Sequence, residues 1–415
     1  MSRSAALSCL VFAALAAVAA PGAAEPRPAG GLFALSGCRT CQQHFPSVAG
    51  SEAGFLAVWE GADATVRQGV FGRPFDHSAL PLAADFQVEK GAQQQPPPQY
   101  DAAAGVDAQG NYVVVWATIA NDLSSIVAQR YTPAGAPAGQ AVVVASDPAS
   151  SPTIPADFKP AVAGTPDGGF AVAWMSLDPA GGATRVMERR YDASDQPTAD
   201  AIQLNDDFPT GERPGICVSD TGRVIVAWTF ADSFQPFQAG KSGVGVRRIY
   251  AGGTPIEEEL VVAPPTAANS AAASVSCGKR NSFVVTWHSE QQPAVSGSDV
   301  LAQRYSRKAH AIGPTFVVNQ KTAGDQKNPA IFHDAAGSFV IVWESTAQGA
   351  IGVFGRRYAT NGDSLSDEFP VYTSTGEQVQ LRPAIAAAGQ DGGFVVVWDG
   401  ASGLFGRRFT IAAQQ

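Results

Sequence analysis

Short apolar runs that end on tryptophan recur along the whole chain. The run from Phe394 to Trp398 is one example, and its counterparts follow one another at intervals of 54 to 59 residues. A hydrophobic motif at a nearly fixed interval is typical of an array of similar structural units. All seven tryptophans of the chain lie at the ends of these runs: Trp59, Trp116, Trp174, Trp228, Trp287, Trp343 and Trp398.

Each repeat predicts four β-strands. A first strand follows a proline, as at Pro383, and a glycine-containing turn at 390–393 leads into the apolar run, which is the second strand. In the preceding copy, the third strand is expected at 353–358 and the fourth at 368–372. The second strand is apolar on both of its faces, so we expect it to be buried from both sides of its sheet.

The two ends of the repeat array predict a closed ring. The seventh copy ends after its third strand at Phe409, and the segment 31–35 stands where a fourth strand belongs. A sheet completed from both ends of the chain leaves no free edge. We therefore predict an all-β fold, a seven-bladed β-propeller of four-stranded antiparallel blades in which strand 31–35 completes the last blade. A β-solenoid or a string of small β-domains is the alternative.

The first 24 residues have the features of a secretory signal peptide. A short positive start at Arg3 precedes an Ala-rich apolar run, and small residues follow before Glu25. A membrane anchor is the alternative, but the run is short and contains few large apolar residues. We expect residues 1–24 to be removed, residues 25–415 to form a single propeller domain, and the protein to be secreted or periplasmic.

The charge balance restricts the partners. The formal net charge is −9, and charged residues make up 16% of the chain. An acidic, sparsely charged protein does not suit nucleic acid, which is bound by lysines and arginines that neutralise phosphates. No segment after the signal peptide is apolar enough to span a bilayer, and we expect a monomer.

The repeats resemble tandem units of the "GGFVVVW…GxFGRRF" type in secreted bacterial proteins. The pattern is read at Gly392–Trp398 and again at Gly403–Phe409, and related units cover about residues 31–410. The resemblance implies an extracytoplasmic, propeller-like repeat and carries no activity with it. The units lack the Trp-Asp ending of WD40 blades and the Asp-box of sialidases.

Four cysteines remain once the signal peptide is removed. Cys38 and Cys41 form a CxxC pair that suits a tight disulfide, a metal site or a haem attachment, and Gln42 in place of histidine excludes the haem motif. We favour the disulfide. Cys217 and Cys277 lie in the first strands of adjacent repeats, with an offset that lets them face each other, so they form either a second disulfide or two buried thiols.

Two repeated features have a structural interpretation. The seven equivalent tryptophans are expected to pack between blades. Arginines recur late in the third strand, where we expect cross-strand ion pairs with acids that open the fourth strand, such as Asp85, Asp200, Glu259 and Glu368. An anion-binding ring is the alternative. The arginines are Arg130, Arg190, Arg304, Arg357 and Arg408.

Binding residues are expected on one face of the propeller. The loops between the second and third strands, and those between blades, vary in length and lie on the same face. Phe230, Phe234 and Phe237 occupy one such loop, where they either bind a sugar or partner or fold onto each other. The remaining candidates directly follow tryptophans: Glu60, His288, Glu344 and Asp399. The three acids among them are expected near the mouth of the central channel.

The sequence favours a binding or scaffold role over catalysis. No zinc-protease, serine-hydrolase, EF-hand or phosphate-binding motif is present, and we expect neither a metal nor a cofactor. The main hypothesis is an exported propeller that recognises a protein or a glycan through its variable loop face. The alternative is a carbohydrate- or ester-acting enzyme that uses the acids at the channel mouth.

Overall fold

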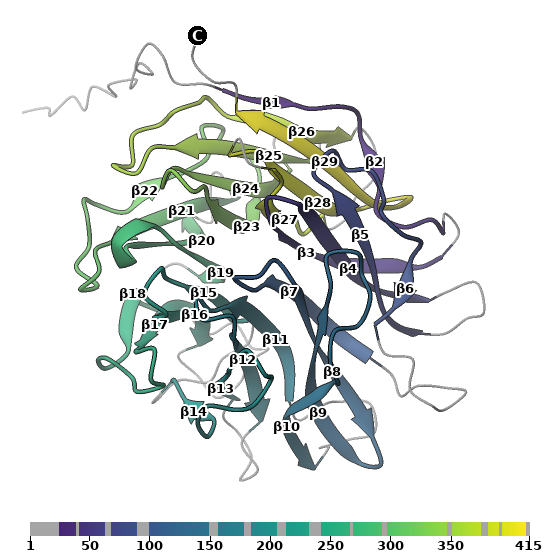
Figure 1. The fold of residues 1–415 in the computed structure, drawn as a ribbon. Coiled ribbons are helices and arrows are strands. Elements are labelled where there is room, and N and C mark those ends of the chain that lie inside the picture. Colours follow the sequence, from purple (N-terminus) through teal and green to yellow (C-terminus); the bar gives the residue numbers. More distant parts are fainter. Residues whose placement is uncertain are drawn as a thin grey trace, which may run out of the picture.

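Seven antiparallel β-sheets are arranged around a common axis in the computed structural model (Figure 1). The predicted signal peptide lies outside the described residues. The first strand of each sheet contacts the first strand of the next, so the first strands converge on the axis. The structure describes residues 25–38, 41–62, 68–88, 99–148, 157–177, 184–205, 213–231, 242–265, 269–292, 297–346, 351–374, 381–389 and 392–411.

The first three blades are meanders of four consecutive strands. Blade 1 contains β3 (Gln43–Gly50), β4 (Gly54–Ala62), β5 (Gln68–Asp76) and β6 (Phe86–Gln87). Blade 2 contains β7 (Gln99–Val106), β8 (Tyr112–Ala120), β9 (Leu123–Tyr131) and β10 (Val142–Pro148). Blade 3 contains β11 (Asp157–Gly164), β12 (Phe170–Leu177), β13 (Thr184–Tyr191) and β14 (Ile202–Gln203).

The next three blades follow the same order. Blade 4 contains β15 (Gly215–Val218), β16 (Val224–Ala231), β17 (Ser242–Ile249) and β18 (Leu260–Ala263). Blade 5 contains β19 (Ser270–Cys277), the 3-10 turn η1 (Lys279–Asn281), β20 (Phe283–Gln292), β21 (Gly297–Tyr305) and β22 (Phe316–Val317). Blade 6 contains β23 (Gln326–His333), β24 (Phe339–Ser345), β25 (Ile351–Tyr358) and β26 (Phe369–Ser374).

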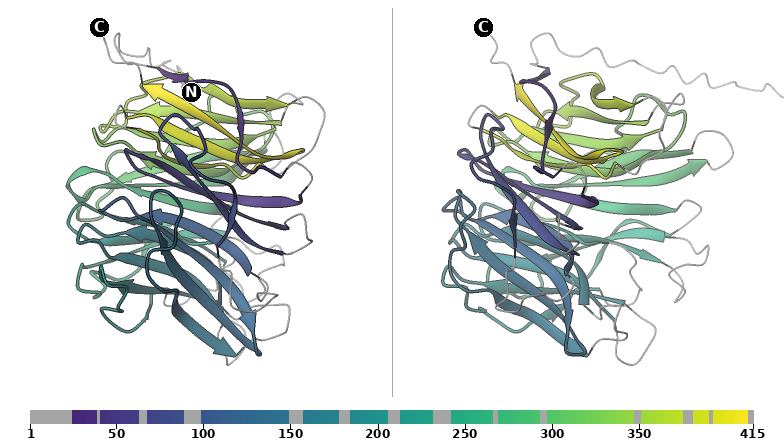
Figure 2. Two further views of the ribbon diagram at one scale, coloured as in Figure 1. Left: turned by 45° about the vertical axis from the view of Figure 1, so that its right-hand side comes forward. Right: turned by 90° about the vertical axis from the view of Figure 1, so that its right-hand side faces the viewer.

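Blade 7 is completed from the start of the described chain, as predicted. Its own strands are β27 (Ala384–Ala387), β28 (Phe394–Gly400) and β29 (Gly403–Ile411). Strand β2 (Phe33–Ala34) pairs antiparallel with β29, and a further short strand, β1 (Pro26–Pro28), pairs with the other end of β29. Both lie beside β29 in the two side views (Figure 2). The prediction of a seven-bladed ring closed by the N-terminal strand is confirmed.

Each junction between blades has its own hydrophobic core. Seven clusters of buried residues are found, and each contains residues of two neighbouring blades, including the pair formed by blades 7 and 1. The seven repeated tryptophans are all buried in these junctions. Burial of the second strands on both faces therefore holds the ring together.

Both predicted cysteine pairs are disulfides. Cys38 is bonded to Cys41 just after the closing strand β2, and Cys217 of β15 is bonded to Cys277 of β19. The second bond joins the first strands of blades 4 and 5, as the offset of one residue between the repeats predicts. No helix among the described segments is long and apolar enough to cross a membrane.

The two ends of the propeller differ in their connections. We call the end with the short hairpins, such as the turn at 107–111, the turn end. The opposite end, where second strands lead into third strands and the chain passes to the next blade, is the loop end. The first strand of every blade runs from the loop end to the turn end, so its first residues lie near the axis at the loop end.

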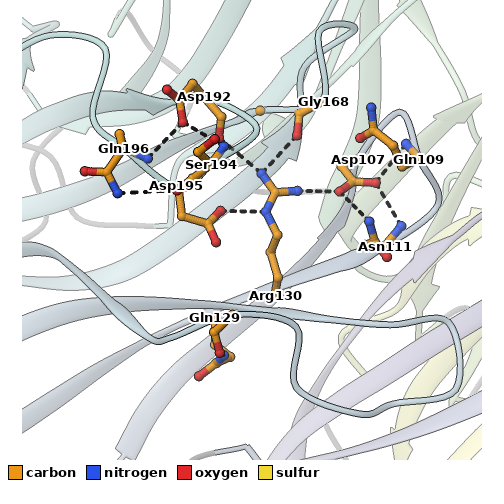
Figure 3. Close-up of polar contacts among 12 residues, drawn as sticks. Asp107, Gln109, Asn111, Gln129, Arg130, Gly168, Asp192, Ser194, Asp195 and Gln196 are labelled. Carbon is orange, nitrogen blue, oxygen red and sulfur yellow. Dashed lines mark hydrogen bonds and ion pairs between the residues drawn. The ribbon is translucent and has the colours of Figure 1, made fainter.

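At the turn end, Arg130 of β9 joins blade 2 to blade 3 (Figure 3). Its side chain is 7% exposed and donates to the Asp107 carboxylate in the turn of its own blade. Its Nε lies 2.5 Å from Oδ1 of Asp195, and its Nη2 lies 2.9 Å from the carbonyl oxygen of Gly168. Asp195 and Gly168 belong to two turns of blade 3, so one guanidinium binds three turns.

The predicted pairing with acids that open the fourth strand is wrong for Arg130, Arg190 and Arg357. Arg130 binds turn residues, Arg190 pairs with Glu188 of its own strand, and Arg357 pairs with Asp334 in a turn. The fourth-strand acid Asp85 pairs instead with Arg73, which precedes the repeated position. A buried guanidinium carries five N–H groups, and the turns supply the several carbonyl and carboxylate acceptors that it requires.

Candidate functional site

The first strand of most blades is interrupted by a β-bulge at the loop end. The register shifts there in β3, β7, β11, β19 and β23. One residue at each bulge, and Arg382 before β27, has a left-handed backbone with φ between 38° and 56°. We call the equivalent positions of the seven blades the bulge ring: Phe45, Asp101, Lys159, Arg213, Ala272, Asn328 and Arg382.

Carboxylates of the preceding blade hold this backbone in place. The N–H of Asp101 donates to Oε1 of Glu60 at 2.6 Å, and the N–H of Phe45 donates to the carboxylate of Asp399. Glu60 and Asp399 directly follow the tryptophans of blades 1 and 7. The left-handed residue turns its N–H toward the neighbouring blade, and strained backbone of this kind is concentrated at functional sites.

Glu60 has an unusual protonation equilibrium. Burial and the negative charge of Asp101 raise the pKa of Glu60 to about 7. The Asp101 N–H, Arg213 and His44 act in the opposite direction but are outweighed. A carboxyl group with this pKa is present in both its acid and its base form at neutral pH, which suits proton transfer.

His44 connects Glu60 to Asp399. It lies opposite Glu60 across the β3–β4 pair, and its Nδ1 is 3.0 Å from Oδ2 of Asp399. Burial raises the pKa of Asp399, while the His44 contact, the Phe45 N–H and Arg382 reduce the shift. Three titratable groups from blades 1 and 7 are therefore adjacent at the loop end.

Arg213 reaches these groups from blade 4. Its Nη1 donates to the carbonyl oxygen of Ala102 at 3.2 Å, and its Nη2 lies 3.6 Å from Oδ1 of Asp101. Oδ2 of Asp101 accepts the backbone N–H of Lys159 at 3.3 Å. A guanidinium and a backbone N–H are therefore both directed at the Asp101 side chain. We call His44, Glu60, Asp101, Arg213 and Asp399 the acid–base cluster.

An aromatic surface adjoins the acid–base cluster. Phe45 is 37% exposed. Its φ of 56° is a left-handed backbone conformation that bulky residues rarely adopt. The Arg382 guanidinium carbon lies 4.4 Å from the centroid of the Phe45 ring. The stacked pair places a flat apolar face and a cation next to His44.

Glu344, the third acid predicted from the sequence, binds groups that join two blades. Glu344 follows the tryptophan of blade 6, as Glu60 does in blade 1. Its Oε2 accepts the side-chain amide of Asn328 at 3.1 Å and the backbone N–H groups of Leu381 and Arg382 at 3.2 and 3.5 Å. These contacts hold the junction of blades 6 and 7.

The predicted histidine and phenylalanines lie elsewhere. His288 is partly buried at the junction of blades 5 and 6, where desolvation of its ring and the charge of Lys327 lower its pKa to about 4. Phe230 is 1% exposed in the core between blades 3 and 4, so its predicted role in ligand binding is wrong. Its ring lies over Gly243, where no side chain competes for the space. Phe234 and Phe237 lie outside the described residues.

Most of the cluster was missed by the sequence prediction, including His44, Asp101 and Arg213. The bulge ring has one signal in the sequence. Its members recur once per repeat, and in most repeats they directly precede the proline of the first strand, as at Phe45 and Arg382. Among the described residues, no group of three or more histidines, cysteines and acids could hold a metal ion.

Comparisons with known proteins concern the fold. No protein-family model and no curated protein matches the sequence. An ulvan lyase, described as a new family of polysaccharide lyase, has a TM-score of 0.53 at 7% identity, over 96% of both chains. An α-L-arabinanase from Penicillium chrysogenum reaches 0.49 at 12% identity, over 75% of this chain and 93% of its own. The β-propeller domain of the trilobed protease from Pyrococcus furiosus has a TM-score of 0.48 at 8% identity, over 92% of this chain and 98% of its own.

Proposed function

We propose that this chain is an exported carbohydrate-acting enzyme that cleaves a glycosidic bond at its acid–base cluster. Sequence analysis favoured a binding or scaffold role, and catalysis was its alternative. The observation that favours catalysis over binding is the environment of Glu60. This carboxyl group has a pKa raised to about 7 and lies beside a second carboxylate, Asp101. Solvated loop acids on a binding face have no reason to carry such a shift.

The roles follow from the two environments. Glu60 in its acid form donates its proton to the leaving glycosidic oxygen. Asp101 in its base form takes a proton from the attacking water, whose oxygen bonds to the anomeric carbon as the glycosidic bond breaks. The proton then returns from Asp101 to Glu60. Arg213 and His44, which both reduce the pKa of Glu60, keep that carboxyl from being fully protonated at neutral pH.

Export and a sugar substrate are supported by independent features. The two disulfides suit an oxidising compartment, and the pattern of residues 1–24 predicts a signal peptide. The fold is shared with a polysaccharide lyase. The exposed Phe45 ring beside the cluster offers the kind of flat apolar surface on which sugar rings stack.

The experiment is a reducing-end assay on a panel of neutral and acidic polysaccharides with the mature protein, E60Q and E344Q. Glu344 occupies the matching position of blade 6, so E344Q makes the same chemical change at a junction that lies outside the acid–base cluster. We expect E60Q to lower kcat by about 10²- to 10⁴-fold and E344Q to leave it within about twofold. The wild-type rate should fall as the pH rises above about 7, because the acid form of Glu60 is lost.

Two results would overturn the proposal. The first is that no polysaccharide of the panel yields new reducing ends, and the second is that E60Q cleaves as fast as the wild type. Tight binding of a glycan without cleavage would restore the binding role.

A further inference from the structure

Aromatic side chains gather in three consecutive blades at the loop end. In blades 1, 2 and 3, the residues directly before the bulge ring are His44, Tyr100 and Phe158. Each of them is paired across its sheet with the residue that follows the tryptophan of its blade. In blades 5, 6 and 7, the same position holds Ala271, Lys327 and Leu381. Equivalent backbone therefore carries rings in one part of the propeller and no ring in blades 5 to 7. We call His44, Phe45, Tyr100 and Phe158 the aromatic arc.

The two ends of the aromatic arc have the same construction. At one end the guanidinium of Arg382 lies over the Phe45 ring, and at the other end Nζ of Lys159 lies 5.7 Å from the centroid of the Phe158 ring. Phe45 is 37% exposed and Phe158 is partly buried. Neither ring is a member of the hydrophobic cores found among the described residues. A cation over its face orients each ring, so both are held in place without being enclosed between blades.

The carboxyl pair of the acid–base cluster lies between these two rings. Glu60 is paired across β3 and β4 with the residue before Phe45. Asp101 accepts the backbone N–H of the residue after Phe158. The N–H of Asp101 in turn donates to Glu60. The order around the axis is therefore Phe45 and Glu60 in blade 1, Asp101 in blade 2 and Phe158 in blade 3.

Two polar groups of the aromatic arc are open to a ligand. His44 is held through Nδ1 by Asp399, its side chain is 58% exposed, and its Nε2 has no hydrogen-bond partner among the described residues. Burial raises the pKa of Tyr100 and the negative charge of Glu60 raises it further, so the Tyr100 ring lies near that carboxyl. In the described part of the chain the Tyr100 hydroxyl has no hydrogen-bond partner either. An imidazole nitrogen and a phenol can each bind a sugar hydroxyl.

This order of groups suits an extended ligand. Flat aromatic rings offer the apolar surface on which sugar rings stack. If one sugar stacks on Phe45 and another on Phe158, a chain that joins them passes the Glu60–Asp101 pair and continues in both directions. Two contacts joined by one chain bind more tightly than either alone, because the second contact forms within the complex. Sugar-binding groups on both sides of the reacting carboxyls require substrate on both sides of the bond that breaks.

We propose that the aromatic arc binds an extended glycan chain, whose units stack on Phe45 and Phe158 on either side of the cleavage point and whose hydroxyl groups are bound by His44 and Tyr100. The substrate is then a polysaccharide that is cut at internal bonds. This inference rests on the proposed function for the position of the cleavage point. It adds the length of the substrate and the residues that bind it.

The test is binding, measured without cleavage on the inactive E60Q protein. The probes are the hexasaccharide and the disaccharide of linear glucan, xylan, mannan, arabinan and galacturonan, each titrated by calorimetry. We expect at least one hexasaccharide to bind about tenfold or more tightly than its own disaccharide, because only the longer chain contacts both rings.

Substitutions in the E60Q background then locate the contacts. F45L and F158L keep an apolar side chain but remove the flat ring, and each should weaken hexasaccharide binding by about fivefold or more. Y100F removes one hydroxyl and no packing, so the test survives if a ring variant unfolds, and it should weaken binding by about threefold. Thermal unfolding midpoints report the fold. The control is Y250L at the turn end, where a ring that is 47% exposed also has an arginine carbon 5.7 Å from its centroid, and it should leave the affinity unchanged.

The outcomes separate this inference from the proposed function. The inference is overturned, even if polysaccharides are cleaved, when hexasaccharides bind no more tightly than disaccharides or when F158L and Y100F keep full affinity. Release of single sugars alone from the end of a chain by the wild type overturns it as well. Binding that increases with chain length and depends on both rings supports the inference even if the wild-type protein cleaves nothing.

Discussion

The turn end and the loop end of this propeller are made from the same seven repeats, yet they use the repeats differently. At the turn end, equivalent arginines such as Arg130, Arg248 and Arg357 bind turns and their acids. At the loop end, the bulge ring carries a phenylalanine, an aspartate, a lysine, two arginines, an alanine and an asparagine. Packing requires the same contact at every junction, whereas a ligand that is not symmetric requires different side chains around one axis.

The backbone shows the same contrast. At the turn end the left-handed positions are mostly occupied by glycine in hairpins, as at Gly110 and Gly168, where the conformation carries no steric cost. In the bulge ring at the loop end, six non-glycine residues adopt it, among them Phe45 and Lys159. A bulky residue such as Phe45 in this costly backbone conformation is the hypothesis of function that the strained position supports.

The largest effect on stability is expected at the turn end. Substitution of Arg130 by methionine leaves the buried carboxylate of Asp107 without its cation and removes the contacts with Asp195 and Gly168. We expect R130M to lower the free energy of unfolding by about 3–5 kcal/mol, as for other broken buried ion pairs. Urea denaturation of the two proteins measures this.

The matched control is Arg304, which occupies the same repeat position in blade 5. Its Nη1 donates to the carbonyl oxygen of Thr360 at 3.2 Å in an exposed setting. R304M should therefore cost only about 1 kcal/mol. Equal losses in R130M and R304M would contradict the view that the buried carboxylate sets the size of the effect.

The architecture was predictable because the repeat dictates it. The missing fourth strand of the seventh copy identified the closing strand at Phe33–Ala34, and the offset between Cys217 and Cys277 identified a disulfide. Strand β1 was missed because its sequence, Pro26–Pro28, contains two prolines, which normally argue against a strand. Proline is tolerated here because β1 lies at the outer edge of its sheet.

The candidate site was only partly predictable. Glu60 and Asp399 were found because they follow tryptophans, but their pKa shifts depend on residues of other blades. Phe230 follows a tryptophan by two residues and continues the strand into the core, so its aromatic character was misread as a loop feature. A left-handed backbone at Phe45 is invisible in the sequence, because that residue type rarely adopts it.

The second prediction concerns Glu60 and the pH dependence of stability at the loop end. Its folded-state pKa of about 7 lies above the ordinary value of 4.5, so the folded protein holds this proton more tightly than the unfolded chain. Stability is therefore lost as the pH rises from about 4.5 through 7. One pKa unit corresponds to about 1.4 kcal/mol, and solvent screening of a half-buried group reduces this, so we expect roughly 2 kcal/mol.

The measurement is the free energy of unfolding between pH 5 and pH 8 for the wild type and E60Q. The wild type should lose stability relative to E60Q as the pH rises, because glutamine cannot ionise. E344Q makes the same substitution in blade 6 and is measured alongside as the reference. Parallel curves for the wild type and E60Q would show that Glu60 titrates normally and would remove the main support for its role as the acid.

The smallest effect on stability is expected at the bulge ring, where the two ends of the molecule differ most. Ala272 and Phe45 have nearly the same φ, 53° and 56°. A272G should stabilise the fold by about 1 kcal/mol through relief of the left-handed strain and should leave glycan binding intact. F45G relieves the same strain but loses the stack with Arg382, which contributes about 0.5–1 kcal/mol, so its stability should change little while affinity for a glycan substrate falls. Unfolding midpoints and calorimetric titrations of both variants measure the two quantities. If F45G binds as tightly as A272G, the aromatic ring has no part in recognition; if it binds more weakly at unchanged stability, the strain at this position is maintained for the ligand.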